Sequence, residues 1–169
     1  MTPPATPPAT PPRPTAAQAR RMRSAARFYA VQALFQMEAA DAGLETVIEE
    51  FETHRLGAEI DGVAYADPDV AHFRALLTAA VTEQARIDQL TDRALVARWP
   101  IDRIDPTLRA LFRAAGAELV ATDTPPKVTI NEFLDVAKAF YPEGKEARFV
   151  NGVLDHMARA ARPEAFAGG

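Results

Sequence analysis

The sequence contains no cysteine and only one serine, Ser24, in 169 residues. The missing cysteines exclude disulfides, thiolate metal sites and a cysteine nucleophile, and Ser24 has no neighbouring histidine that would activate it. His54, His72 and His156 fall in three different predicted helices, without the spacing of a metal pair, and no glycine-rich phosphate loop occurs. We therefore predict no catalytic residue, no metal site and no cofactor, and a protein that is not an enzyme.

Long apolar runs are also missing. No stretch approaches the roughly 20 apolar residues that a membrane-spanning helix requires. Prolines occupy the N-terminal positions where a signal peptide would carry its apolar segment. We expect a cytoplasmic protein.

Acidic residues are absent from the first 37 positions, which contain five arginines. The rest of the sequence carries all 23 acidic residues against 14 basic ones, although the net charge of the whole chain is only -4. This separation of charge predicts a polyanionic partner for the basic N-terminal part and leaves an acidic surface for a basic protein partner.

The chain divides into a tail, one domain and a second short tail. Residues 1–15 contain a T-P-P-A repeat, and half of the 14 prolines lie in residues 1–14, which predicts polyproline II or disorder. Residues 16–163 have the length and the apolar content of a single helical domain. We predict that residues 164–169 form a disordered C-terminal tail.

Apolar residues recur with a helical period along the domain, and no segment alternates with the period of a strand. We therefore predict an all-α fold of six or seven helices. The predicted helices cover residues 16–40, residues 44–56, a long segment from 68 to 95 with a bend between 82 and 88, a central helix from 106 that ends before 124, residues 129–140 and residues 145–162, with loops at 57–67 and 101–104 and a stop at Trp99-Pro100.

Capping residues predict several of these helix starts. Pro68 suits the first turn of a helix, and Asp105-Pro106 combines an N-cap with proline at the first helical position. Thr129 and Glu132 have the spacing of a capping box.

Arginines cluster at the start of the first predicted helix, at positions 20, 21, 23 and 27. On a helix, Arg20, Arg23 and Arg27 fall in one stripe, close to an apolar stripe that contains Phe28, Val31, Leu34 and Phe35. Two interpretations remain open, because these arginines are either simply solvated or hold phosphates. A helix N-terminus disfavours cations, which supports the second interpretation.

The last predicted helix carries an aromatic residue bordered by cations. Phe149 lies at the edge of the apolar face, beside Lys145, Arg148, Gly152 and His156 on the helical wheel. An unpaired base could stack on such a ring while its phosphates meet the cations. Phe149 as an ordinary core residue is the competing interpretation.

Three segments resemble the NusB family of bacterial transcription antitermination factors. They are Arg27-Phe-Tyr-Ala-Val-Gln-Ala-Leu-Phe35, Lys127-Val-Thr-Ile-Asn-Glu132 and, most characteristically, Arg148-Phe-Val-Asn-Gly-Val-Leu-Asp155, and the similarity spans about Arg20 to Pro163. The resemblance implies two packed helical subdomains. It also implies binding of single-stranded boxA RNA of ribosomal RNA transcripts together with NusE, a small-subunit ribosomal protein, and delivery of this complex to RNA polymerase.

The RNA surface of the family combines the arginine-rich N-terminus with the start of the FVNG helix. Together with the cation pattern, this gives a predicted RNA-binding set of eight residues, Arg20, Arg21, Arg23, Arg27, Lys145, Arg148, Phe149 and Asn151. The chain departs from the family pattern at Ser24 and Ala25, where relatives can have arginines, and at Lys145, in a turn that is often acidic. A composite site requires the N-terminal end of the first helix to lie beside the start of the last.

Two other classes of function remain open at this point. The NusB fold also occurs as an RNA-binding domain in some ribosomal RNA cytosine methyltransferases, but this chain has neither the length for a methyltransferase domain nor the cysteine nucleophile. A purely protein-binding helical module is the other alternative. A homodimer that covers the RNA surface is a further possible state of the free protein.

Overall fold

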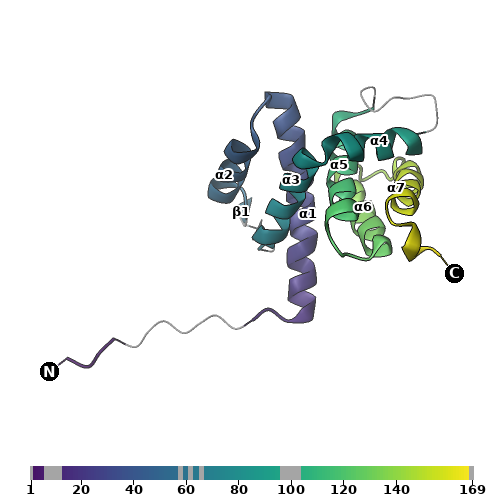
Figure 1. Cartoon of the computed structure of the whole chain (residues 1–169). Coiled ribbons are helices and arrows are strands. Elements are labelled where there is room, and N and C mark those ends of the chain that lie inside the picture. The colour runs from purple at the N-terminus through teal and green to yellow at the C-terminus, as the bar shows by residue number, and fades with distance from the viewer. Residues whose placement is uncertain are drawn as a thin grey trace.

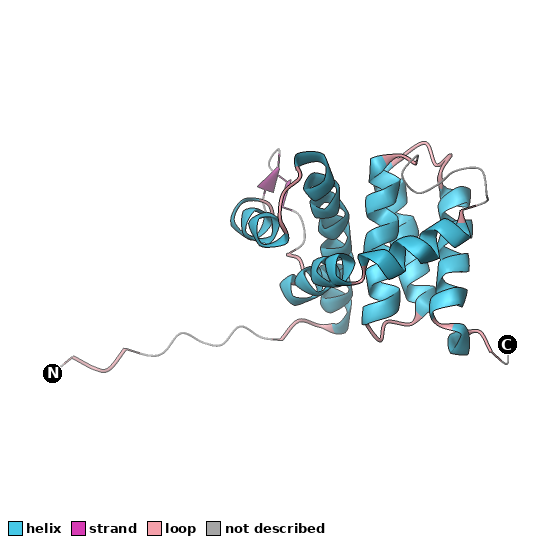
Figure 2. Cartoon of the chain, turned by 45° about the horizontal axis from the view of Figure 1, so that its top comes forward, coloured by secondary structure: helices cyan, strands magenta, loops and turns pink. Residues whose placement is uncertain are grey.

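The computed structural model describes residues 2–5, 13–56, 59–60, 63–64, 67–95 and 104–167. Seven α-helices and a final short 3-10 helix make up most of this part of the chain, which confirms the predicted all-α fold (Figure 2). The elements are α1 (Ala16–Ala40), α2 (Leu44–His54), α3 (Val70–Thr82), α4 (Gln84–Ala94), α5 (Pro106–Ala121), α6 (Pro126–Phe140), α7 (Ala147–Ala161) and the 3-10 helix η2 (Pro163–Ala165).

The segment predicted as a loop at 57–67 contains one short strand pair. Strand β1 (Glu59–Ile60) pairs antiparallel with β2 (Val63–Ala64), with Glu59 opposite Ala64. Two residues per strand are too few to show a period of two in the sequence. The pair therefore leaves the fold class unchanged.

The helices form two packed groups, as the resemblance implies. Helices α1, α2 and α3 pack together, and α4, α5, α6 and α7 form the second group (Figure 1). Helices α1 and α3 both pack against α5, so α5 joins the two groups. The backbone N–H of Asp69, just before α3, also donates to the carbonyl of Met22 in α1, at 2.9 Å.

Helix α5 is the central helix that the sequence predicts. Every residue from Leu108 to Leu119 is buried except Arg113, which is half-buried. At Gly116, a Cβ atom would lie 2.4 Å from the Cγ2 atom of Ile87. Glycine at this position therefore allows α4 to approach α5 closely.

Three of the six predicted helix starts are confirmed, that of α2 at Leu44 among them, and the three at residues 68, 129 and 145 are wrong. Helix α1 begins at Ala16 and α5 begins with Asp105 as N-cap and Pro106 in its first turn. Pro68 instead precedes α3, whose N-cap is Asp69. Thr129 is not an N-cap, because α6 already begins at Pro126.

The long helical segment from 68 to 95 divides at Glu83, within the predicted bend. The last helix begins at Ala147, so Lys145 lies in the preceding turn. Beyond it, Pro163 opens η2, and the guanidinium of Arg159 lies 4.6 Å from the centre of the Phe166 ring. These contacts differ from the prediction of a disordered tail from residue 164 onward. The stop at Trp99-Pro100, most of the connector 101–104 and most of the proline-rich tail lie outside the described residues.

Candidate nucleic-acid interface

The first arginines of α1 are exposed because the helix starts just before them. Thr15 caps the helix through a capping box, in which its hydroxyl accepts from the backbone N–H of Gln18 and its own N–H donates to the Gln18 side chain. Arg20 and Arg21 are exposed and Arg23 is half-buried. Within the described part of the chain, none of the three forms an ion pair or a hydrogen bond through its side chain.

Arg27 has a different environment from the other three arginines. Its side chain is only 2% exposed, and its Nε donates to both carboxylate oxygens of Glu118 in α5, at 3.1 and 2.9 Å. Its Nη1 lies 3.5 Å from Glu132 in α6. No acid near Arg27 in the sequence neutralises it, but two acids distant in the sequence do. The prediction that Arg27 contacts RNA therefore does not fit this geometry, and Arg27 connects α1 to α5 and α6 instead.

The carboxylate of Glu118 is the centre of this buried network. It accepts hydrogen bonds from Thr129 Oγ1 and pairs with His72 Nε2, both at 2.7 Å, in addition to Arg27. Burial by itself raises the pKa of Glu118, but the hydrogen bonds from His72, Arg27 and Thr129 and the charge of Arg27 outweigh it, so the pKa lies below its usual value. Glu118 is thus held as a carboxylate.

A cleft of about 520 Å³ opens above this network. Arg20 and Arg23 lie on one side of it, and the connection between α5 and α6 forms the other side. Two acids, Asp123 and Glu132, also line the cleft, and Ser24 donates to Glu132 at 2.7 Å. The complete lining is Arg20, Arg23, Arg27, His72, Thr122, Asp123, Thr124, Pro125, Val128 and Glu132.

The predicted residues at the start of α7 lie on its outer side. Arg148 and Asn151 are exposed, and Lys145 is exposed with only a 3.5 Å contact to the equally exposed Glu143. Phe149 is half-buried and packs edge-to-face on Phe112 of α5, with ring centres 6.2 Å apart. The ring therefore belongs partly to the core and partly to the surface.

The turn before α7 is held by Tyr141. Its hydroxyl donates to Asp105, the N-cap of α5, at 2.8 Å. Burial and this hydrogen bond both raise the pKa of Tyr141, so the hydroxyl keeps its proton and remains a donor. The start of α7 is thereby anchored to the start of α5.

The two groups of predicted RNA-binding residues are not adjacent in the way that the sequence predicts. The end of α7, and not its start, lies beside the arginine-lined cleft, because Arg162 donates to the carbonyls of Thr122 and Thr124 at 3.3 and 3.4 Å. The start of α7 follows Phe140 at the end of α6, which stacks on Phe28 further along α1. The expectation of direct juxtaposition is therefore wrong, because α7 runs in the opposite direction to α1 (Figure 1).

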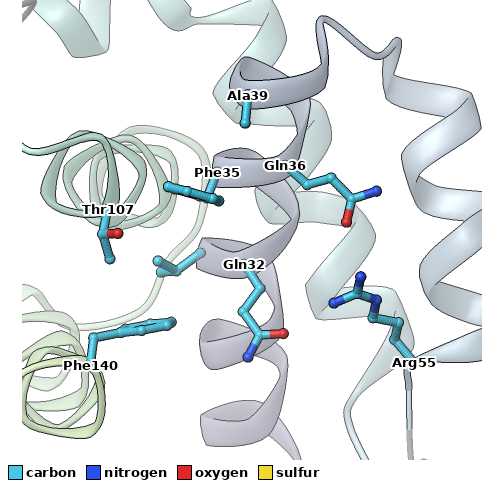
Figure 3. A pocket seen from close by; sticks show the side chains of 8 residues that line it. Gln32, Phe35, Gln36, Ala39, Arg55, Thr107 and Phe140 are labelled. Atoms are coloured by element: carbon cyan, nitrogen blue, oxygen red, sulfur yellow. The ribbon is translucent and has the colours of Figure 1, made fainter.

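A second concave surface, which includes Phe35, has no signal in the sequence (Figure 3). Phe35 belongs to the predicted apolar stripe of α1, but its side chain is 39% exposed. It lies at the edge of that stripe, where helical periodicity does not separate a core position from a surface position.

The described residues contain no group of three or more metal-ligating side chains. The three histidines lie on α2, α3 and α7, and His72 is engaged with Glu118. None of the described helices is both long and apolar enough to cross a membrane.

Proteins of known function are similar to this chain over most of its length. A transcription antitermination protein NusB from Brucella abortus (strain S19) is 46% identical over 143 residues, which cover 84% of this chain and 83% of that protein. One from Mesorhizobium japonicum is also 46% identical over 143 residues, covering 84% and 92% of the two chains.

Solved structures share the fold. The NusB structure from T. maritima aligns with a TM-score of 0.66 and 30% identity, covering 88% of this chain and 96% of that one. A crystal structure of antitermination factors NusB and NusE in complex with double-stranded RNA aligns with a TM-score of 0.66 and 25% identity, over 83% and 98%. Residues 24–159 match the model of the NusB family. This match and the two relatives that are 46% identical show that the chain belongs to the NusB family.

Proposed function

We propose that this chain is a non-enzymatic, cytoplasmic transcription antitermination factor. In this proposal it binds boxA-type single-stranded RNA of ribosomal RNA transcripts together with NusE and delivers the complex to RNA polymerase. The named relatives are transcription antitermination proteins, and a structural relative was crystallised with NusE and RNA. The mechanism is the positioning of two partners, with no bond chemistry.

One observation carries the RNA-binding part of the proposal. Arg20, Arg21 and Arg23 lie together on the first turns of α1 without a protein partner among the described residues, whereas Arg27 two turns on is fully paired. Unpaired guanidinium groups on one surface suit phosphate oxygens, because each can donate two parallel hydrogen bonds.

The start of α7 supplies the second part of the proposed surface. Arg148 and Lys145 provide further cations for phosphates, Asn151 provides an exposed amide, and Phe149 presents a half-buried ring to a base. Because the arginines of α1 and the start of α7 are not adjacent, we propose that the RNA strand runs from one to the other over several nucleotides. The binding residues in this proposal are Arg20, Arg21, Arg23, Lys145, Arg148, Phe149 and Asn151.

Titration of a labelled boxA-type RNA at several salt concentrations tests the proposal. With about four phosphate contacts, log affinity falls with log salt at a slope near -3 for a single strand, and Arg20→Ala/Arg23→Ala makes the slope about 1.4 units shallower. Arg86→Ala/Arg93→Ala on α4 is the matched control, since it removes two exposed arginines elsewhere and leaves the slope unchanged.

The same titration with NusE present tests the shared site. An increase in RNA affinity on addition of NusE supports joint binding. Sedimentation of the protein without and with the RNA shows whether a homodimer dissociates when the RNA binds. Absence of measurable RNA binding even with NusE present would overturn the proposal and favour a purely protein-binding module.

A further inference from the structure

The arginine-lined cleft contains a carboxylate that the phosphate contacts proposed above do not use. Asp123 lines the cleft from the connection between α5 and α6, on the side opposite Arg20 and Arg23 of α1. A carboxylate repels phosphate oxygens, so phosphate binding alone does not explain an acid at this place. The volume of the cleft, about 520 Å³, lies within the range of about 300–1,000 Å³ that is typical of small-ligand sites. The cleft is therefore large enough for one nucleotide.

Asp123 differs from the other acid that lines the cleft because it has no partner. Glu132 accepts a hydrogen bond from Ser24 at 2.7 Å and lies 3.5 Å from Nη1 of Arg27. Asp123 is exposed and forms no ion pair and no side-chain hydrogen bond among the described residues. An ionised carboxylate only accepts hydrogen bonds, so Asp123 is available to a ligand that carries a donor.

The backbone on both sides of Asp123 is fixed by hydrogen bonds. Thr122 Oγ1 donates to the carbonyl of Glu118 at 2.8 Å, and the backbone N–H of Thr124 donates to Thr122 Oγ1 at 3.3 Å. At the end of α7, Arg162 donates to the carbonyls of both threonines. The segment that carries the carboxylate is therefore ordered before a ligand binds, which lowers the entropic cost of binding.

The unpaired groups of the cleft match the groups of an RNA backbone. Arg20 and Arg23 only donate hydrogen bonds, and phosphate oxygens only accept them. Asp123 only accepts, and the ribose 2′-hydroxyl of RNA can donate. A DNA strand has the same phosphates but lacks this hydroxyl, so it would leave Asp123 facing phosphates without a donor.

We propose that Asp123 accepts a hydrogen bond from the 2′-hydroxyl of one nucleotide, while Arg20 and Arg23 hold an adjacent phosphate. Asp123 thereby makes the cleft selective for RNA over DNA. The inference rests on the proposed function, and it adds a specificity-determining residue to the binding residues given there.

The test uses boxA-type RNAs that carry a single 2′-fluoro group, placed at one nucleotide at a time. Fluorine retains the RNA-like sugar conformation but cannot donate a hydrogen bond. For the wild-type protein we expect one position at which the 2′-fluoro group weakens binding by about tenfold. Asp123→Ala should bind the unmodified RNA about tenfold more weakly and should lose no further affinity at that position.

A DNA strand of the same sequence supplies the second measurement. Asp123→Ala should bind this DNA at least as tightly as the wild-type protein does, because the substitution removes a charge that faces phosphates. The preference for RNA over DNA should therefore fall by about tenfold or more. Asp123→Asn retains the shape of the side chain and a neutral acceptor, and its loss of RNA affinity should be smaller.

Glu49→Ala is the matched control, because Glu49 is an exposed acid on α2, outside the cleft, and its removal should leave the preference for RNA unchanged. If Asp123→Ala binds RNA and DNA more tightly by the same factor, the carboxylate only repels the strand and the inference fails. If no 2′-fluoro position depends on Asp123 while Arg20→Ala/Arg23→Ala still weakens RNA binding, the proposed function stands and this inference fails. If the wild-type protein binds no RNA, both proposals fail.

Discussion

Helices α5 and α7 both carry charged residues and one internal glycine, but the two helices use them differently. On α5, Glu118 and Arg109 are buried and engaged with residues of other elements, and Gly116 lies against Ile87. On α7, Arg148 is exposed, and a Cβ atom added at Gly152 would meet nothing within 4 Å. Packing within the protein explains the buried charges and the glycine of α5, but it does not explain Arg148 and Gly152 on α7.

This difference separates residues that hold the fold from residues that remain available to a ligand. A buried ion pair is expensive to break because it leaves a charge uncompensated, whereas an exposed cation costs little to remove. The same distinction divides the arginines of α1, since Arg27 pairs with Glu118 while Arg20 and Arg21 face solvent. Three predictions test the distinction.

The largest effect is expected for Glu118→Ala. The substitution leaves the guanidinium of Arg27 buried without its main partner, and we expect the free energy of unfolding to fall by about 3–5 kcal/mol, as measured by urea denaturation. Asp155→Ala on α7 removes a carboxylate from an exposed pair with Arg159 and should cost less than about 1 kcal/mol. Equal losses for the two variants would contradict the contrast between the helices.

Alanine substitutions at the two glycines are expected to change the stability less, and in opposite directions. Gly116→Ala places a methyl group against Ile87 and should destabilise the protein by about 1–3 kcal/mol. Gly152→Ala meets open space in a helix interior and should stabilise it by about 0.5–1 kcal/mol. Thermal unfolding of both variants checks this. A loss of stability in Gly152→Ala would show that α7 is not open on this side.

Acid pH is expected to change the free energy of unfolding least and most gradually. The pKa of Glu118 is lowered in the folded protein, so its contribution to stability is present above the ordinary glutamate pKa and is lost as pH falls through the lowered folded pKa. Urea denaturation between neutral pH and acid should show a shallower loss for Glu118→Gln than for wild type. The pKa values of Glu38 and Glu52 are also lowered, so some acid sensitivity remains in the variant. Identical pH profiles would contradict the role given to Glu118.

Local patterns predicted the helices well. The bounds of α1, the division at Glu83 and the start of α5 at Asp105-Pro106 all follow from apolar spacing and capping chemistry within a few residues. The predicted cap at Thr129 is wrong because α6 already begins at Pro126, and the Thr129 hydroxyl donates to Glu118 in another helix. A capping box and a buried hydrogen bond use the same side chain, and spacing does not distinguish them.

The sequence by itself determined the helical period, the family resemblance and the concentration of arginines at the start of α1. Which arginines are free was decided only by the tertiary structure, because Arg27 meets an acid that lies 91 residues away. The direction of α7, the exposure of Phe35 and the concave surface that includes it were decided in the same way. Helical period depends on neighbours within a few turns, whereas ion pairing and exposure depend on which helices pack together.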